Sequence, residues 1–266
     1  MRGLALEGGG AKGAYHIGVA KALMDSGYEF DGFVGTSIGA VNAAILAQGD
    51  LETALDAWEN ISMDKLFDFN ERLLQLIEKR SVAPDSDLPF LLKELLTKLI
   101  NDKGIVTDKM KAFLNQYIDE ERIRASGKDF GLVTVNLNTR KPHRLMLSDI
   151  PHGLLTSYIM ASASLPGFRS ETIGDSSFID GAFHDNCPYE LLYEKGYDEI
   201  IAVRTNALGI FRKIKDTKRV KVITPGEDLG HTMLFTKERS KKNIELGYND
   251  GLKYVRSKAL LEMSKS

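Results

Sequence analysis

The sequence has few of the residues that stabilise small secreted folds or bind metals. Cys187 is the only cysteine among 266 residues, which excludes an internal disulfide and any metal motif built from paired cysteines. A lone thiol fits a reducing compartment. We therefore expect a chain held together by an ordinary hydrophobic core, long enough for one large domain.

Excess positive charge and long apolar runs are also missing. The formal net charge is −2 and the pI is about 6.2, so the chain has no basic field for a nucleic-acid backbone. Glu7 interrupts the first apolar run too early for a signal peptide. The apolar stretch at residues 34–46 is broken by polar residues and too short to span a bilayer. We expect a cytoplasmic protein that at most makes peripheral contact with a membrane.

Alternating strand and helix patterns predict an α/β fold. Short apolar runs favour strands at residues 3–6 and 30–34, and helical spacing follows each of them, at residues 14–24 and 38–48. Later segments continue the pattern, with strands at 130–137, 143–147, 178–179, 200–203 and 220–223, and helices at 188–195 and from about 236. The chain should form a single domain over residues 1–266, a mostly parallel central sheet covered by helices on both faces.

The middle of the chain has a different character. Leucines recur at helical spacing within residues 88–100, and Thr107 precedes a second helical pattern that extends to Ile118. We interpret residues 61–127 as a helical insertion on one side of the sheet. The leucine stripe is typical of a helix packed on its own domain; a lid at the mouth of a site is the alternative.

Gly35-Thr36-Ser37-Ile38-Gly39 lies between a predicted strand and a predicted helix. This is the context of a nucleophile elbow, in which a sharp turn presents the serine and the glycines remove clashing side chains. Ser37 is therefore a candidate nucleophile, with Gly35 and Gly39 as the elbow glycines. The alternative is a tight turn in which Ser37 only caps the helix.

A second turn, Gly8-Gly9-Gly10-Ala11-Lys12-Gly13, also leads from a strand into a helix. Its free backbone amides could converge on an anion, such as the oxyanion of a tetrahedral intermediate. The same glycines match a dinucleotide fingerprint, but no acidic residue ends the second strand to bind a ribose. A phosphate-binding P-loop fails because no Lys-Ser/Thr pair follows.

Asp180-Gly181-Ala182 ends another apolar strand, where an aspartate can act as a base. A histidine could serve instead. His184 and His231 follow in the Ser…Asp…His order of α/β-hydrolases, while no local motif marks His16, His143 and His152. An elbow after only the second strand does not fit that other fold, yet the histidine-based triad stays open as an alternative.

The three motifs together resemble the patatin-like phospholipases in content and order. Ala161-Ser162-Ala163-Ser164-Leu165-Pro166 looks like another segment of this family, and the tail from Gly247 to Gly251 is similar to bacterial members. The likeness spans nearly the whole chain except residues 61–127. Taken alone each motif is modest, whereas their joint occurrence is specific.

The resemblance implies a Ser–Asp dyad without a catalytic histidine, metal or cofactor. Ser37 would be the nucleophile and Asp180 the base, and the amides of Gly8, Gly9 and Gly10 would form the oxyanion hole. Lys12 and Gly13 would complete this anion-binding loop, although many members carry arginine at the position of Lys12. The implied substrate is a phospholipid or related fatty-acyl ester. A catalytically idle lipid-binding module on the same scaffold is the alternative function.

Overall fold

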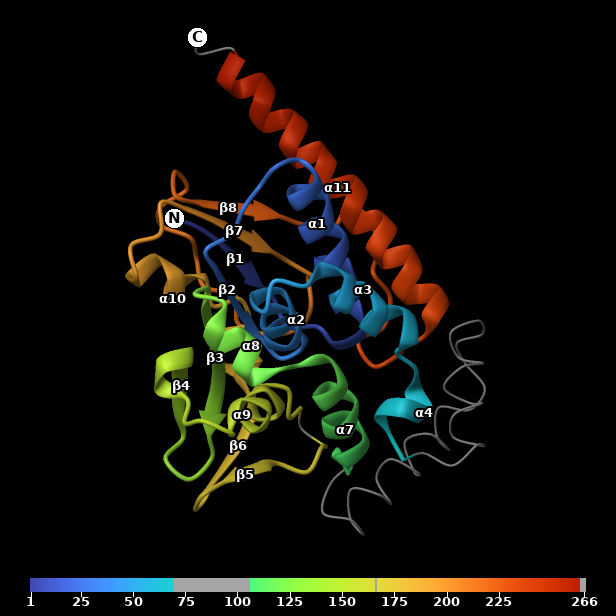
Figure 1. The fold of residues 1–266 in the computed structure, drawn as a ribbon, viewed down its shortest axis with the longest axis vertical. Helices are drawn as coiled ribbons and strands as arrows, with labels where there is room; N and C mark the ends of the chain where they lie inside the picture. Colours follow the sequence, from blue (N-terminus) through green and yellow to red (C-terminus); the bar gives the residue numbers. More distant parts are fainter. Residues whose placement is uncertain (69–105, 166, 264–266) are drawn as a thin grey trace.

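The computed structural model describes residues 1–68, 106–165 and 167–263. Within these residues the strands form one eight-stranded sheet at the centre of the molecule, in the order β5-β6-β3-β2-β1-β7-β8 with β4 also paired to β3 (Figure 1). The strands are β1 (Arg2–Leu6), β2 (Gly32–Thr36), β3 (Asp129–Asn136), β4 (Lys141–Met146), β5 (Glu171–Ile173), β6 (Ser176–Asp180), β7 (Glu199–Val203) and β8 (Val220–Ile223).

Five neighbouring strands, β3, β2, β1, β7 and β8, run parallel, which confirms the predicted fold class. The antiparallel strands lie at one side, where β4 and β6 both pair with β3 and β5 pairs with β6. β2 begins two residues later than the sequence pattern indicates and continues to Thr36. As a result the strand ends directly before Ser37.

Helices cover both faces of the sheet. They are α1 (Ala14–Asp25), α2 (Ile38–Ala47), α3 (Leu51–Asn60), α4 (Met63–Leu66), α7 (Asp108–Tyr117), α8 (Glu120–Ala125), α9 (Leu155–Ser162), α10 (Tyr189–Glu194) and α11 (Lys237–Met263). In the part of the chain that the structure describes, three short 3₁₀ turns lie between a strand and the next helix, namely η1 (Gly10–Gly13), η2 (Leu147–Asp149) and η3 (Gly181–Phe183).

Side-chain alternation along the strands gives each face its own core. Leu4 and Leu6 point to the larger core, which they share with α1, α2, α3, α7 and α9. Ala5, between them, points to the opposite face and packs with Leu192 of α10. This period of two is the reason the short β1 can be buried on both sides.

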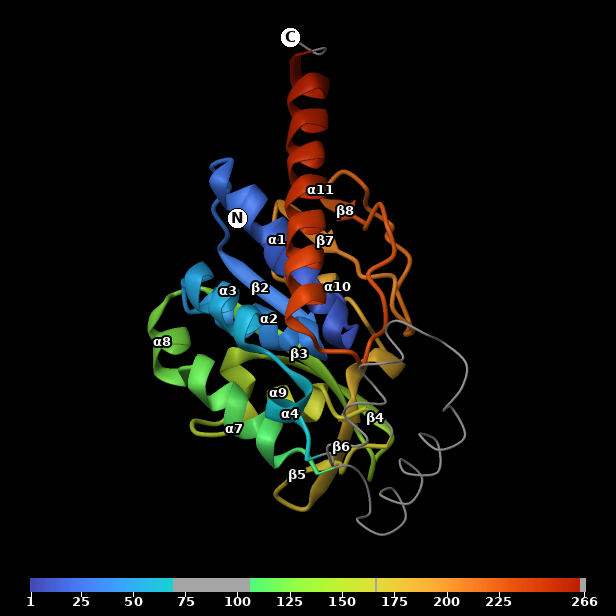
Figure 2. The ribbon, with the colours of Figure 1, turned by 90° about the vertical axis from the view of Figure 1, so that its right-hand side faces the viewer.

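The long helix α11 lies along α1, and its C-terminal end extends beyond the rest of the molecule (Figures 1 and 2). The two helices approach closely because glycines face the partner backbone. A Cβ on Gly18 would collide with the carbonyl of Ile244, and one on Gly247 would collide with that of Tyr15. The glycine-containing tail therefore serves helix packing.

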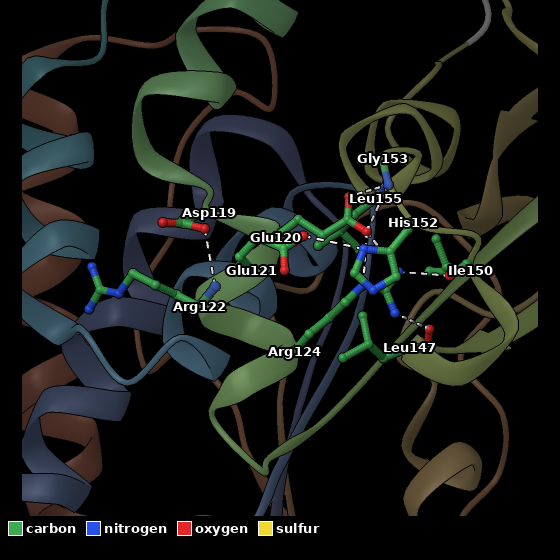
Figure 3. A network of polar contacts seen from close by, with 10 residues as sticks. All are labelled: Asp119, Glu120, Glu121, Arg122, Arg124, Leu147, Ile150, His152, Gly153 and Leu155. Carbon is green, nitrogen blue, oxygen red and sulfur yellow. Dashed lines mark hydrogen bonds and ion pairs between the residues drawn. The ribbon is translucent and has the colours of Figure 1, made fainter.

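An ion pair with several backbone contacts fixes the start of α9 (Figure 3). The Glu120 carboxylate accepts hydrogen bonds from the N–H groups of Gly153 and Leu155 and from the guanidinium of Arg124. Arg124 also donates to the carbonyl of Ile150 at 2.7 Å. A carboxylate at a helix N-terminus is favourable for the unpaired amides and for the helix dipole. The network thus holds α9, which ends at Ser162.

Three helices, α4, α7 and α8, lie within residues 61–127, and residues 69–105 are outside the described residues. The leucine stripe at 88–100 falls there. α7 begins after Thr107 as expected, but the Thr107 side chain makes no capping hydrogen bond. Met110, Phe113 and Leu114 of α7 are buried, as the spacing predicts.

Candidate functional site

Ser37 occupies the sharp turn between β2 and α2. Its φ of 57° and ψ of −129° lie where side chains are rarely found, and only 5% of the residue is exposed. Such a conformation costs on the order of 1–3 kcal/mol and persists only where the surrounding structure enforces it. α2 starts at the next residue, so its N-terminal dipole lies beside the Ser37 hydroxyl.

Close packing around the turn requires both elbow glycines. A Cβ on Gly35 would collide with the backbone of Gly39, and one on Gly39 would collide with the carbonyl of Leu6. The turn is therefore pressed against the end of β1 with no room for side chains. Larger residues at either position would displace Ser37.

The ends of β2 and β6 meet on one edge of β3. β4 pairs with residues 131–136 along one edge of β3. On the other edge, β2 pairs with β3 as far as Val133, and β6 pairs with it from Asn136 back to Thr134. Thr36 pairs with Val133, and Asp180 pairs with Thr134. This head-to-head arrangement brings Ser37 and Asp180 together from 143 positions apart in the sequence.

Asp180 is fully buried beside Ser37. Its Oδ1 accepts the N–H of Ala182 at 2.8 Å. Oδ2 has no hydrogen bond of standard geometry within the described part of the chain. Burial raises the pKa of the carboxyl to about 6, while the N–H of Ala182 and the Ser37 hydroxyl act to lower it. The Ser37 contact is thus a loose one, as is common without substrate.

The segment after α9 contacts both candidate catalytic residues. Ser162 Oγ accepts the N–H of Ser37 at 2.9 Å and donates to the carbonyl of Val133 at 2.7 Å. The carbonyl of Ser164 accepts the N–H of Asp180 at 2.9 Å. The sequence marked this segment only through its family resemblance. Its contribution comes from backbone bonds, which residue spacing does not reveal.

The glycine loop has two unpaired amides rather than three. The N–H of Gly8, which the resemblance assigns to the oxyanion hole, donates to the carbonyl of Asn186 at 2.9 Å and is therefore already paired in this structure. The N–H groups of Gly9 and Gly10 have no acceptor among the described residues. Their φ angles of 151° and 55° turn the backbone beside Ser37. Gly10 and Ser37 line the same pocket.

A buried carboxylate that the sequence did not single out fixes the glycine loop. Glu7 accepts hydrogen bonds from Arg204 and from the N–H groups of Thr205 and Asn206, the last two at 2.6 Å and 2.9 Å. Thr205 Oγ1 in turn donates to the carbonyl of Gly8 at 2.6 Å. The loop after β7 therefore supports the glycine loop from behind. A charged residue next to a predicted strand was the only sequence signal for this role.

The rest of the expected anion loop has a structural role. The carbonyl of Gly13 accepts a hydrogen bond from Asn42 Nδ2 at 2.9 Å. Asn42 also contacts His16 Nδ1 and accepts the indole N–H of Trp58. Lys12 is half-buried, and its charge helps to lower the pKa of Asp228. Of the proposed loop, Gly10 is the residue that lines the pocket with Ser37.

An apolar pocket opens at Ser37. Its volume is about 700 Å³, including the part open to solvent, and its walls come from α2, α3, α4 and α7 and from the chain around Phe168 and Phe235. Val41 and Ile45 line it on successive turns of α2. Among the described residues that line it, the polar side chains are Ser37, Asn42 and the hydroxyl-bearing Tyr117, besides the indole of Trp58. Such a pocket can accommodate a hydrocarbon chain.

None of the five histidines, all of them described, forms a hydrogen bond with Ser37 or Asp180. His16 is buried against Asn42, and burial lowers its pKa to about 3. His184 contacts Arg212, and His152 pairs with Glu121. The arrangement does not support the histidine-based triad.

Among the described helices, none has the length and apolar character needed to cross a bilayer. In the same residues, His, Cys, Asp and Glu side chains do not gather in groups of three or more that could bind a metal.

Comparison with known proteins identifies the family. The model for patatin-like phospholipases matches residues 4–193, a range that contains the glycine loop, Ser37 and Asp180. The chain belongs to the patatin-like phospholipase family. Its fold resembles the crystal structure of VipD from Legionella pneumophila, with a TM-score of 0.60, 16% identity and coverage of 96% of this chain and 67% of that one.

Patatin-like sequences from eukaryotes are also similar. Over 207 residues, or 77% of this chain, the sequence is 30% identical to lysophospholipase NTE1 of Coccidioides immitis. It is 27% identical over 211 residues to a patatin-like phospholipase domain-containing protein of Caenorhabditis elegans. This chain spans only 12% and 13% of the lengths of these two relatives.

Proposed function

We propose that this protein is a serine acyl hydrolase that cleaves fatty-acyl esters of phospholipids or related lipids. The observation that carries the proposal is a serine held in a strained elbow, beside a buried aspartate and at the mouth of an apolar pocket. Family membership supports the same chemistry, and the relatives named lysophospholipases favour a lipid with one acyl chain.

The reaction would begin when Asp180 takes the proton of the Ser37 hydroxyl. Burial raises the pKa of this carboxyl to about 6, which makes the carboxylate a stronger base than an exposed aspartate but leaves it ionised at neutral pH. Ser37 Oγ then attacks the ester carbonyl carbon, and the negative charge moves to the carbonyl oxygen. The amides of Gly9 and Gly10 and the N-terminus of α2 are suited to stabilise that oxygen.

Collapse of the tetrahedral intermediate breaks the bond to the alcohol, which leaves with the proton from Asp180. The acyl group remains on Ser37 as an ester, its chain in the apolar pocket. Water, deprotonated by Asp180, then attacks this ester, and the proton returns to Ser37 as the fatty acid departs. No step needs a histidine, a metal or a cofactor.

A fluorophosphonate probe and a short-chain nitrophenyl ester test this proposal. Wild-type protein should be labelled on Ser37 and should hydrolyse the ester, whereas Ser37→Ala should do neither. Asp180→Asn should lower turnover by at least about 10²-fold, the scale of a general base. His184→Ala and His231→Ala should retain activity.

Two results would contradict it. A histidine variant that abolishes turnover while Asp180→Asn retains it would restore the histidine-based triad. Wild-type protein that is neither labelled nor active, but still binds lipid, would favour the idle lipid-binding module. Comparing the lipids hydrolysed by wild type and Ser37→Ala would then identify the substrate class.

A further inference from the structure

Three large apolar side chains gather on the surface beside the glycine loop. Phe183, Leu208 and Ile210, here called the apolar tip, are 51%, 99% and 52% exposed. They come from two segments joined by hydrogen bonds, from the N–H of Ile210 to the carbonyl of Ala182 and from the N–H of Asn186 to the carbonyl of Ile210. Single exposed apolar residues are ordinary, whereas a cluster indicates an interaction surface.

The backbone on both sides of Leu208 is anchored. On one side Glu7 accepts the N–H groups of Thr205 and Asn206. On the other, Ile210 bonds to the segment that follows Asp180. The exposure of Leu208 is thus a property of a fixed loop.

The apolar tip borders the candidate active site. A Cβ on Gly9 would lie 3.2 Å from Cβ of Ala207, and one on Gly209 would lie 2.8 Å from Cβ of Asn186, whose carbonyl accepts the N–H of Gly8. A surface that contacts Leu208 therefore also faces the loop beside Ser37.

Along the chain, a run of positive charge follows the apolar tip. Residues 204–221 contain seven lysines and arginines and a single carboxylate, Asp216, in a chain with a net charge of −2. Arg204 and Arg212 pair with buried carboxylates. Lys213, Lys215 and Lys218, here called the lysine row, are exposed, and their ammonium groups have no acidic partner within the described residues.

We propose that the apolar tip and the lysine row form a docking surface for bilayers that contain anionic phospholipid. The tip would enter the interfacial region of the bilayer, while the lysines approach the headgroups. Exposed apolar residues beside unpaired cations are the combination that peripheral membrane binding uses. The surface goes beyond the proposed function, and its test needs no catalysis.

Charge complementarity favours a lipid surface over a second copy of this chain. Two copies would bring their lysine rows together, and three side chains bury far less than the roughly 800 Å² per partner of a stable dimer. Each lysine near an anionic membrane strengthens binding roughly fivefold at moderate salt. Removing all three should therefore weaken binding by about 100-fold.

Vesicle sedimentation with the Ser37→Ala protein tests the surface without hydrolysing the lipid. The vesicles are pure phosphatidylcholine, or phosphatidylcholine with 30% phosphatidylserine. We expect binding to the anionic vesicles that decreases with added salt. Leu208→Ser/Ile210→Ser should reduce binding to both kinds of vesicle at least tenfold, and Lys213→Glu/Lys215→Glu/Lys218→Glu should abolish the preference for phosphatidylserine.

The matched control is Leu260→Ser/Leu261→Ser, on the projecting end of α11, where the side chains are 67% and 61% exposed. It should bind vesicles like the parent protein. When Ser37 is left intact, the Leu208→Ser/Ile210→Ser variant should hydrolyse the soluble ester at the wild-type rate. This result would separate membrane binding from catalysis. Unchanged vesicle binding in both surface variants would overturn the proposal, as would a dimer that Leu208→Ser/Ile210→Ser dissociates.

Discussion

The backbone N–H of Ser37 donates a hydrogen bond to the hydroxyl of Ser162, over 2.9 Å. The same hydroxyl donates to the carbonyl of Val133, and two residues later the carbonyl of Ser164 accepts the N–H of Asp180. The end of α9 therefore holds the candidate nucleophile and the candidate base in one arrangement. These hydrogen bonds go to the backbone N–H groups of both residues.

Replacing Ser162 by alanine should weaken both catalysis and folding. The change leaves the N–H of Ser37 and the carbonyl of Val133 buried without their partner, which should lower the free energy of unfolding by about 1–3 kcal/mol. A small displacement of Ser37 should reduce kcat roughly 10- to 100-fold with little change in KM. Urea unfolding and ester hydrolysis measure the two effects.

Ser164→Ala is the matched control. Among the described residues, the Ser164 hydroxyl donates only to the carbonyl of Met160, while the bond to Asp180 comes from the Ser164 backbone. This variant should keep kcat within about twofold of wild type, since no contact of the dyad changes. Equal losses in the two serine variants would contradict the positioning role of Ser162.

The activity should depend on the ionisation of Asp180. Burial raises the pKa of this carboxyl from 3.8 to about 6, and only the ionised form can accept the Ser37 proton. We expect kcat/KM to fall about tenfold per pH unit below pH 6 and to level off above it. Asp185 provides the control, because burial raises its pKa to about 6 as well, although its carboxylate pairs with Arg212. The fall in kcat/KM below pH 6 should persist in Asp185→Asn. If the fall disappeared in this variant, it would reflect the ionisation of Asp185 and not that of Asp180.

The same burial makes ionised Asp180 destabilising. Because the folded-state pKa of about 6 exceeds the ordinary value of 3.8, the protonated carboxyl is favoured in the folded state, and stability falls as pH rises through this range. Asp180→Asn, which keeps an acceptor for the N–H of Ala182, should therefore be more stable at pH 8 by up to about 3 kcal/mol. The gain should shrink towards pH 4. Ser37→Ala keeps the carboxylate and removes a hydroxyl that lowers its pKa, so this variant should show no gain in stability as the pH rises; thermal unfolding across this range measures both.

The parts of the fold that depend on local pattern were predictable. The strand–turn–helix context placed Ser37 correctly because β2 and α2 follow from neighbouring residues. The direction of β6 was not predictable: the sequence predicted an apolar strand before Asp180 in a mostly parallel sheet, yet β6 runs antiparallel to β3. A strand of five residues carries no information on which edge it joins.

Long-range partners explain the remaining differences. The amide of Gly8 could not be recognised as occupied, because its acceptor is the carbonyl of Asn186, far along the chain. Glu7 likewise became interpretable only when β7 brought Thr205 and Asn206 to it. The motifs thus identified the loops of the site, whereas the usable amides and their supports depend on tertiary contacts.

The hydroxyl of Thr205 should support catalysis through the glycine loop. It donates to the carbonyl of Gly8 at 2.6 Å, so Thr205→Val removes this bond while conserving shape. We expect kcat to decrease roughly 5- to 30-fold, equivalent to about 1–2 kcal/mol of lost transition-state stabilisation, and KM to stay within twofold. Thr205→Ser retains the hydroxyl and should restore kcat. A valine variant with unchanged kcat would show that Glu7 alone holds the loop.

The side chains of α2 that line the apolar pocket should set the length of acyl chain that the pocket accepts. Val41 and Ile45 line the pocket four and eight residues after Ser37, which corresponds to about 6 Å and 12 Å along the helix. Val41→Trp should therefore block chains soon after the carbonyl, and Ile45→Trp only longer ones. Nitrophenyl esters from two to sixteen carbons measure the cut-off in each variant as a fall in kcat/KM. Acetate esters should be hydrolysed by both variants at rates near wild type, since the dyad is intact. If the two tryptophans gave the same cut-off, or if neither changed chain-length preference, the acyl chain would have to leave Ser37 in another direction, and this pocket would not be its binding site.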